Sequence, residues 1–273
     1  MTFAELETKA RRIRLAALEQ TVAKGKGHLG GTYSCVDLLV ALYYGGILRI
    51  DPQKPDWPER DRFILSKGHA CLALYSILVD LGFLTTTQLD SYGEDGGLGA
   101  QLDVSIAGVD WNTGSLGHAL GVTAGMALAA RMDGRDNIAV TIMGDAEIAE
   151  GSVWEAIAFA SDFGLSNLVA IIDRNRLSVT EVLEDDAIFR NFREKIGSFG
   201  WAFVEIDGHS YPSIMGALSA IRGGDRPTMI LANTIKGKGV SFMENVLKWH
   251  HAVPTWAEVE IARRELGLEG EPS

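Results

Sequence analysis

Short apolar runs rich in β-branched residues are the clearest pattern in the second half of the chain. Turn-forming residues bound each run, and helical patterns separate the first three at a spacing of about 30 residues, the size of one βαβ unit. The runs are IAVTIM (138–143), NLVAII (167–172), AFVEI (202–206) and TMILA (228–232). Because strands that are apolar throughout are buried on both faces, the pattern predicts an α/β fold whose parallel sheet is flanked by helices on both faces.

The first half of the chain has mainly helical periodicity. Apolar positions predict helices over Phe3–Lys24, Ser34–Tyr44 and Ala70–Leu81, and small residues predict a closely packed helix over Gly121–Arg131. The proline-rich and charged segment DPQKPDWPERDR predicts a surface loop. Because neither a repeat nor a linker interrupts these patterns, residues 1–273 are expected to form a single domain.

The net charge limits which kinds of partner are expected, and the cysteine content indicates the cell compartment. The chain has 25 Lys and Arg against 36 Asp and Glu, a net charge of −11, whereas nucleic acids and anionic membranes favour basic surfaces. No apolar stretch approaches membrane-spanning length. Cys35 and Cys71 are isolated in apolar runs, and the start of the chain lacks the pattern of a signal peptide. We therefore expect a cytoplasmic protein that binds neither nucleic acid nor membrane.

Two polar residues follow neighbouring predicted strands. Asp145 comes directly after IAVTIM in the turn GDAEIAEGS, and Asn175 comes just after NLVAII. Because parallel strands end at one edge of the sheet, both side chains should meet there, where their oxygens suit Mg²⁺ and a helix N-terminus suits a phosphate. Taken alone, the pattern is also consistent with Asp145 as a helix cap and Asn175 as a turn residue.

Further motifs, in order, give the chain a strong resemblance to the N-terminal half of transketolases. They are GKGHLGG, LSKGHACLALY, TGSLGHALG, GDAEIAEGSVWEAIAFASDFGLSNLVAIIDRNRL and KGKGVSFMENVLKWHH. The fourth resembles the thiamine-diphosphate signature of the family through its whole length. The resemblance extends from about Leu15 to about Pro254 and implies the thiamine-diphosphate-binding fold of the diphosphate-binding (PP-type) domain.

The resemblance also implies a cofactor and a metal. Asp145, Asn175 and the main-chain carbonyl of Leu177 would coordinate Mg²⁺, for which Ca²⁺ or Mn²⁺ could substitute. Ala146 and His69 would contact the diphosphate of thiamine diphosphate, Gly114 and Leu116 would line its aminopyrimidine, and Gly144 and Ser115 would also bind the cofactor. Glu150 would lie near a subunit interface beneath the cofactor.

Histidines are the expected catalytic residues. By the resemblance, His28 and His250 would face the reactive carbon of the cofactor and, with His69, handle protons of the sugar. The physical case is independent, because cleavage next to a ketose carbonyl needs proton transfer near neutral pH, where imidazole titrates. His209 lacks such a context and is given a turn role, and His118 stands where the family usually has glutamine and is left without a role.

Three departures from the family pattern bear on specificity. Ala146 replaces the third residue of the usual GDG, although its N–H donor remains. The usual WHG is WHH, so His251 is a second candidate beside His250. Gln101 stands where the family has a histidine that touches the donor sugar, and glutamine cannot shuttle a proton at neutral pH. Gln101 and His251 are therefore weaker candidates for substrate contacts.

The resemblance implies a missing partner. In the family, the glutamate that activates the cofactor lies in a pyrimidine-binding domain, to which no residue of this chain corresponds. We expect a split transketolase completed by a second subunit that carries the pyrimidine-binding and C-terminal domains, with two copies of each chain and a sugar phosphate as substrate. The alternatives are a decarboxylating carboligase related to deoxyxylulose-phosphate synthase and a non-catalytic binding subunit of the same fold.

Overall fold

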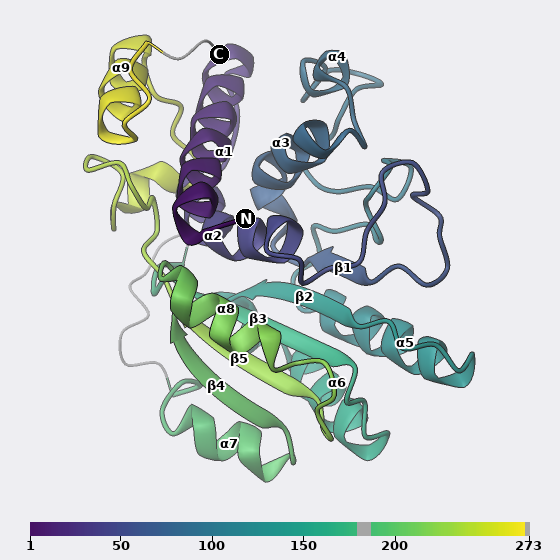
Figure 1. The fold of residues 1–273 in the computed structure, drawn as a ribbon. Helices are drawn as coiled ribbons and strands as arrows, with labels where there is room; N and C mark the ends of the chain where they lie inside the picture. The colour runs from purple at the N-terminus through teal and green to yellow at the C-terminus, as the bar shows by residue number, and fades with distance from the viewer. Residues whose placement is uncertain (179–186, 271–273) are drawn as a thin grey trace.

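One parallel sheet forms the centre of the molecule (Figure 1). In residues 1–178 and 187–270, which a computed structural model describes, the sheet has five strands in the order β1-β2-β3-β5-β4. The strands are β1 (Arg62–Leu65), β2 (Ala139–Gly144), β3 (Leu168–Arg174), β4 (Ala202–Asp207) and β5 (Thr228–Asn233). Every neighbouring pair is parallel, so the α/β class predicted from the apolar runs is confirmed.

Helices cover both faces of the sheet, as predicted (Figure 1). One apolar cluster joins a face of the sheet to α1 (Phe3–Lys24), α2 (Leu29–Tyr44), α3 (Cys71–Leu81) and α8 (Tyr211–Ser219). The short α4 (Thr86–Leu89) and α9 (Trp256–Glu265) pack at the outside of this layer. A second cluster joins the opposite face to α5 (Ala119–Met132), α6 (Gly151–Asp162) and α7 (Phe192–Ser198).

The alternation of side chains explains the apolar runs. In β2, Val140 and Ile142 belong to the first cluster, whereas Ala139 and Met143 belong to the second. Each position therefore packs against one helical layer or the other. The edge strand β4 departs from the prediction of burial on both faces, because Val204 and Glu205 are exposed there.

Helix boundaries largely agree with the predicted ones. Helix α1 has the predicted bounds, begins with a capping box between Thr2 and Glu5, and ends at Gly25 with φ 65°. Helix α2, however, begins at Leu29 rather than Ser34. Its first turn contains two glycines of the GKGHLGG motif that the sequence suggested as a turn. They permit close packing, since a Cβ at Gly31 would lie 3.2 Å from His69 Nε2.

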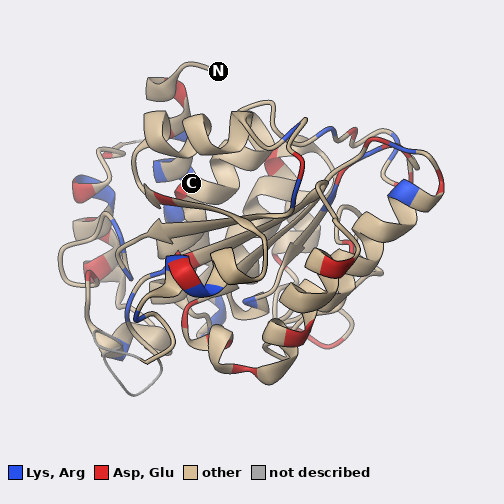
Figure 2. Cartoon of the chain, turned by 90° about the horizontal axis from the view of Figure 1, so that it is seen from below, with Lys and Arg blue, Asp and Glu red and all other residues tan. Residues whose placement is uncertain are grey.

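The carboxyl ends of the strands gather the polar loops at one edge of the sheet, as the sequence predicted. Lys67 and His69 follow β1, Asp145 follows β2, Asn175 follows β3 and Lys236 follows β5. Seen from below, acidic and basic residues are interspersed over the helices and loops (Figure 2). In the described ranges, none of the helices has the length and apolar character needed to cross a bilayer.

Candidate active site

A pocket at this edge of the sheet unites most of the residues that the sequence singled out. Loops from four strands and the first turn of α2 contribute to it. Its lining residues are Gly31, Lys67, His69, Leu116, Gly144, Asp145, Ala146, Glu147, Asn175, Leu177, Ser178, Lys236 and His250. Residues that are as far apart in the sequence as 31 and 250 therefore share one cavity.

Asp145 and Asn175 both line this pocket. Their meeting was predicted, because each follows a parallel strand that ends at the same edge of the sheet. Asp145 is buried; its Oδ1 accepts from Ala146 N at 2.8 Å and its Oδ2 from Arg176 N at 2.6 Å. Burial, followed by the charge of Asp173, raises the pKa of Asp145. Arg176 adopts φ 63°, an uncommon left-handed conformation that directs its N–H toward this carboxylate.

The donor set fits a hard cation and a diphosphate. A buried carboxylate with a raised pKa gains from a nearby cation, and Asn175 and the Leu177 carbonyl add neutral oxygen ligands. Gly144 leaves room, because a Cβ built there would meet no described atom within 4 Å. The helix expected directly after Ala146 is instead a single 3-10 turn, Ala146–Ala149, and α6 begins at Gly151 after the extended Glu150.

Two buried lysines supply positive charge that the sequence analysis missed. Lys67 Nζ donates to Gly31 O at 2.7 Å and pairs with the fully buried Asp173. Burial alone would lower the pKa of Lys67, but the charge of Asp173 raises it. The signal was available, since this lysine stands between an apolar strand and the histidine of the KGH turn.

The second lysine, Lys236, lines the pocket from the segment that follows β5. Its Nζ donates to Leu177 O at 2.9 Å and Ser178 O at 3.0 Å and lies 3.1 Å from His250 Nδ1. Burial, followed by the charge of Lys67, lowers the pKa of Lys236 to about 8. Lys236 therefore joins the segment after β3 to the histidines.

Glu147 is a further buried residue that the sequence analysis passed over. Its carboxylate accepts from Gly117 N at 2.8 Å, from Gly144 N at 3.1 Å and from the Ser66 hydroxyl. Burial raises its pKa. Glu147 thus joins three loops of the pocket, whereas Glu150, the glutamate that the sequence singled out, is exposed.

Four imidazoles form a cluster at the mouth of the pocket. The ring centroids of His28, His69, His250 and His251 lie 4.5–5.6 Å apart in the contacting pairs. Burial is the first cause that lowers the pKa of His69, to about 2, and of His250, to about 3. It also lowers the pKa of His28. Neutral imidazoles offer one donor and one acceptor each, as proton transfer requires.

The remaining predicted residues lie at the rim. Gly114, Ser115 and Leu116 are exposed, and among them Leu116 lines the pocket. Gln101 packs against the Gly114 loop and against the turn that contains His69. A Cβ built at Gly114 would lie 3.3 Å from Gln101 Cγ. Its Oε1 is buried and has no hydrogen-bond partner in the described part of the chain. The side-chain amide of Gln101 therefore lies between the Gly114 loop and the turn of His69.

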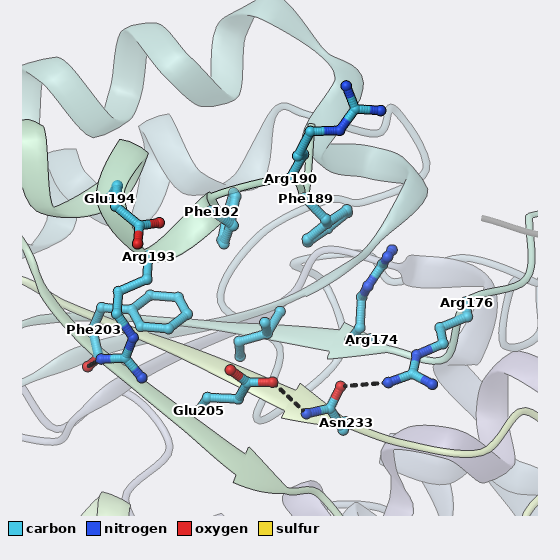
Figure 3. A pocket seen from close by; sticks show the side chains of 11 residues that line it. Arg174, Arg176, Phe189, Arg190, Phe192, Arg193, Glu194, Phe203, Glu205 and Asn233 are labelled. Carbon is cyan, nitrogen blue, oxygen red and sulfur yellow. Dashed lines mark hydrogen bonds between the residues drawn. The ribbon is translucent and has the colours of Figure 1, made fainter. Parts of the chain in front are cut away.

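A separate cavity of about 560 Å³ lies between α7 and the ends of β3, β5 and β4 (Figure 3). Its groups interact with one another: Arg174 stacks 3.6 Å from the Phe189 ring centroid, and Asn233 links Glu205 to Arg176. It contains none of the histidines. We therefore assign the chemistry to the pocket around Asp145.

Comparisons with known proteins agree with this geometry. A family model described as "Transketolase, thiamine diphosphate binding domain" matches residues 6–273. An apulose-4-phosphate transketolase subunit of Phocaeicola vulgatus is 42% identical over 265 residues, covering 96% of this chain and 93% of that protein. The 6-deoxy-6-sulfo-D-fructose transketolase subunit SqwG of Clostridium sp. (strain MSTE9) is 40% identical, covering 97% of this chain and 98% of that protein.

Longer relatives match over part of their length. Human transketolase is 35% identical over 250 residues, covering 90% of this chain and 39% of the human protein. The crystal structure of a transketolase from Campylobacter jejuni superposes on the chain with a TM-score of 0.95 at 27% identity. That match covers 100% of this chain and 44% of the longer one.

Proposed function

The chain belongs to the transketolase family, and we propose that it is the thiamine-diphosphate-binding subunit of a split transketolase. The enzyme would move a two-carbon ketol unit from a ketose phosphate to an aldose acceptor. One observation carries the proposal: a single pocket combines the buried Asp145 and Asn175 with the imidazoles of His69 and His250, and the ring of His28 contacts both of these imidazoles. Residues 1–273 would act as one cofactor-binding domain, and the buried free thiols of Cys35 and Cys71 support a cytoplasmic location.

The metal and cofactor would be held by the residues lining the pocket. Asp145, Asn175 and the Leu177 carbonyl would bind Mg²⁺, or Ca²⁺ or Mn²⁺ in its place, and Gly144, Ala146 and His69 would contact the diphosphate. When bound, thiamine diphosphate supplies the carbanion chemistry that breaks and forms the bond next to the sugar carbonyl. Leu177 O accepts from Lys236 Nζ at 2.9 Å, so a cation bound to that carbonyl would lie close to this ammonium group. Gly114, Ser115 and Leu116 would form the rim against the aminopyrimidine.

The imidazoles would move protons at the sugar hydroxyls. His28 and His250 would exchange protons with these hydroxyls as neutral imidazoles, and burial, which lowers their pKa values, makes them weaker bases than a free imidazole. His69 is held close to the first turn of α2, where it would orient the cofactor and the sugar together. Gln101 and His251 would contact the sugar and influence which donor is accepted.

A second subunit would complete the active site. Two relatives that match over almost their whole length are named as transketolase subunits, and the chain spans about two-fifths of human transketolase. We therefore expect a partner that carries the pyrimidine-binding and C-terminal domains, with two copies of each chain. Its docking face would be the groove between α5 and α6, lined by Gly121, Gly125 and the exposed Phe159, because this groove reaches the pocket rim at Gly117.

The decisive experiment is a ketol-transfer assay with Mg²⁺ and thiamine diphosphate on a panel of ketose phosphates. The chain is assayed alone and mixed with its partner. We expect transfer in the mixture alone, lost in Asp145→Asn and retained in Asp225→Asn, which changes an exposed carboxylate before β5. Decarboxylative carboligation without ketol transfer would contradict the proposal, and so would failure of the wild-type mixture to bind the cofactor.

A further inference from the structure

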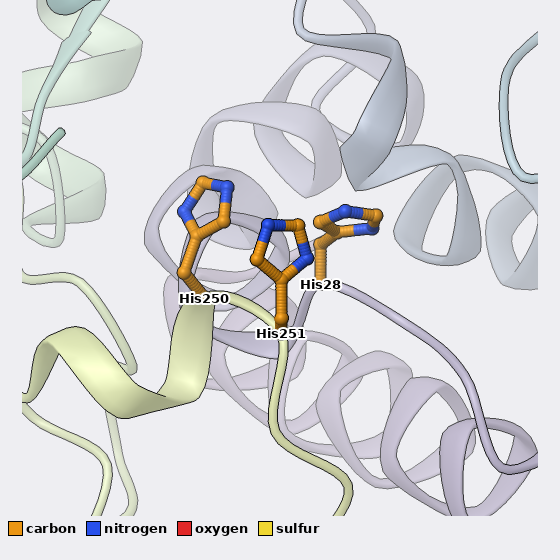
Figure 4. Close-up of side chains that lie close together, drawn as sticks. All are labelled: His28, His250 and His251. Atoms are coloured by element: carbon orange, nitrogen blue, oxygen red, sulfur yellow. The ribbon is translucent and has the colours of Figure 1, made fainter. Parts of the chain in front are cut away.

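Three histidines at the mouth of the pocket point their rings toward a common space (Figure 4). His28 directly precedes α2, His250 ends the short 3-10 segment Leu247–His250, and His251 directly follows it. The potential ligand atoms of the three lie within 4.8 Å of one another. Because the two segments are more than 200 residues apart in the sequence, the cluster is a product of the fold.

The rings are suited to bind a metal. Nδ1 of His28 is buried and has no hydrogen-bond partner in the part of the chain that the structure describes. His251 is exposed, so its ring can rotate to shorten the distances. Neutral imidazole is the ligand form of histidine, and the pKa values of His28 and His250 are both lowered.

We propose that His28, His250 and His251 together bind one borderline divalent cation, such as Zn²⁺, at a site separate from the hard-metal ligands around Asp145. Three histidines with one open position form a known tetrahedral zinc arrangement. Imidazole favours Zn²⁺, Co²⁺ and Ni²⁺, whereas Mg²⁺ prefers oxygen ligands. The two sites would therefore select different ions from the same solution.

Lys236 limits the affinity of this site. Its Nζ lies 3.1 Å from His250 Nδ1, so its positive charge opposes a cation on that side of the ring. The ion is therefore held on the side of the His250 ring that faces away from Lys236, among the three imidazoles. Lys236 Nζ is held beside the ring by the carbonyls of Leu177 and Ser178, to which it donates.

The functional consequence rests on the proposed ketol transfer. The ion would occupy the space between His28 and His250 where the sugar is expected to bind, so Zn²⁺ would inhibit in competition with the ketose donor. His251 stands where the resemblance places glycine, so this inhibition would depend on the second histidine of the WHH segment.

Titration of the chain alone with Co²⁺ tests the site, because a tetrahedral Co²⁺ centre absorbs visible light. The titration uses the Asp145→Asn background, so that the oxygen-ligand site does not compete. We expect one ion per chain, and we expect His251→Gly to weaken binding by at least the roughly 10–100-fold that loss of an outer partner costs a metal site. His118→Ala, which removes an exposed histidine in the groove between α5 and α6, should leave binding by the isolated chain unchanged. The proposal would be overturned if His251→Gly bound Co²⁺ as tightly as the Asp145→Asn chain that retains His251, or if that chain bound no Co²⁺.

Inhibition is measured separately, with the partner chain present and Mg²⁺ in excess. Zn²⁺ should raise the apparent KM for the ketose without lowering kcat, and His251→Gly should relieve the effect at least tenfold. If Co²⁺ binds to the chain but Zn²⁺ inhibition does not compete with the donor, the inhibitory role is wrong although the site exists. If the mixture lacks ketol transfer, the proposed function fails while the Co²⁺ result stands.

Discussion

Asp37 Oδ2 lies 2.6 Å from Nδ1 of His209, although 172 residues separate the two in the sequence. The other ring nitrogen of His209 accepts from Ile235 N at 2.8 Å. The ring therefore bridges α2 and the residue that precedes Lys236 in the pocket. The turn role given to His209 from the sequence is incomplete: its backbone N–H does bond to Asp207 Oδ1, but its ring also positions the Lys236 segment.

Removing the His209 ring should weaken cofactor binding through Lys236. His209→Ala leaves the Ile235 N–H and the Asp37 carboxylate without partners, and we expect the Kd of thiamine diphosphate to rise about tenfold, or roughly 1.4 kcal/mol. His209→Gln should recover part of the loss, because an amide can donate at one end and accept at the other. Cofactor titrations with the partner present measure both. Wild-type affinity in His209→Ala would show that the ring does not position Lys236.

Asp37 should make stability depend on acidic pH. Burial alone would raise its pKa, but the charge of Arg14 and hydrogen bonds from His209 and Arg14 lower it to about 2. Because the pKa in the folded state is below the unfolded value, the stabilisation is present above about pH 4 and is lost as the pH falls toward 2. Between pH 5 and pH 3 the unfolding free energy of the wild type should fall by about 1 kcal/mol more than that of Asp37→Asn. Urea titrations at both pH values compare them, and equal losses would contradict the assignment.

Glu147 should contribute to stability as well as to the pocket. Glu147→Ala leaves Gly117 N–H, Gly144 N–H and the Ser66 hydroxyl without their acceptor. Since each unsatisfied buried group costs about 1–3 kcal/mol and some will be solvated, we expect the unfolding free energy to fall by about 3 kcal/mol. The matched control is Glu150→Ala, an exposed carboxylate whose loss should change it by less than about 0.5 kcal/mol. Chemical denaturation of the isolated chain distinguishes the two, and equal effects would refute the role of Glu147.

A methyl group at Gly31 should impair catalysis. The added Cβ would lie 3.2 Å from His69 Nε2 and 3.7 Å from Lys67 Nζ, so the imidazole must move. We expect Gly31→Ala to lower kcat/KM about 100-fold while the chain stays folded, since small misplacements of reacting groups carry costs of that order. Gly216→Ala in α8, where a Cβ would meet no described atom within 4 Å, should leave activity unchanged and raise stability by about 0.5–1 kcal/mol. Full activity of Gly31→Ala would show that His69 tolerates displacement.

Local patterns predicted the sheet and the proposed metal ligands, because each signal lies within one short segment. The apolar runs gave β2 and β3, and the polar residues that end them gave Asp145 and Asn175. The missed residues depend on distant partners. The partners Gly117 and Ser66 of Glu147 lie 30 and 81 residues from it, so its burial has no local signature.

The same reason explains the missed lysines. Although Lys67 stands next to the histidine of the KGH turn, a charged residue in a glycine-rich turn usually lies at the surface, and its ion-pair partner Asp173 is 106 residues away in the sequence. The early start of α2 was also hidden, because GKGHLGG has the composition of a turn and becomes helical where Gly31 packs against His69.

The common direction of the strands has a practical consequence. All of the proposed chemistry lies where the strands end, so the loops that lead into the strands are free of it. The exposed residues Arg222–Arg226 lie directly before β5, at the opposite edge of the sheet. A fluorescent label, an affinity tag or an immobilising tether inserted at Gly223 would therefore leave the pocket accessible.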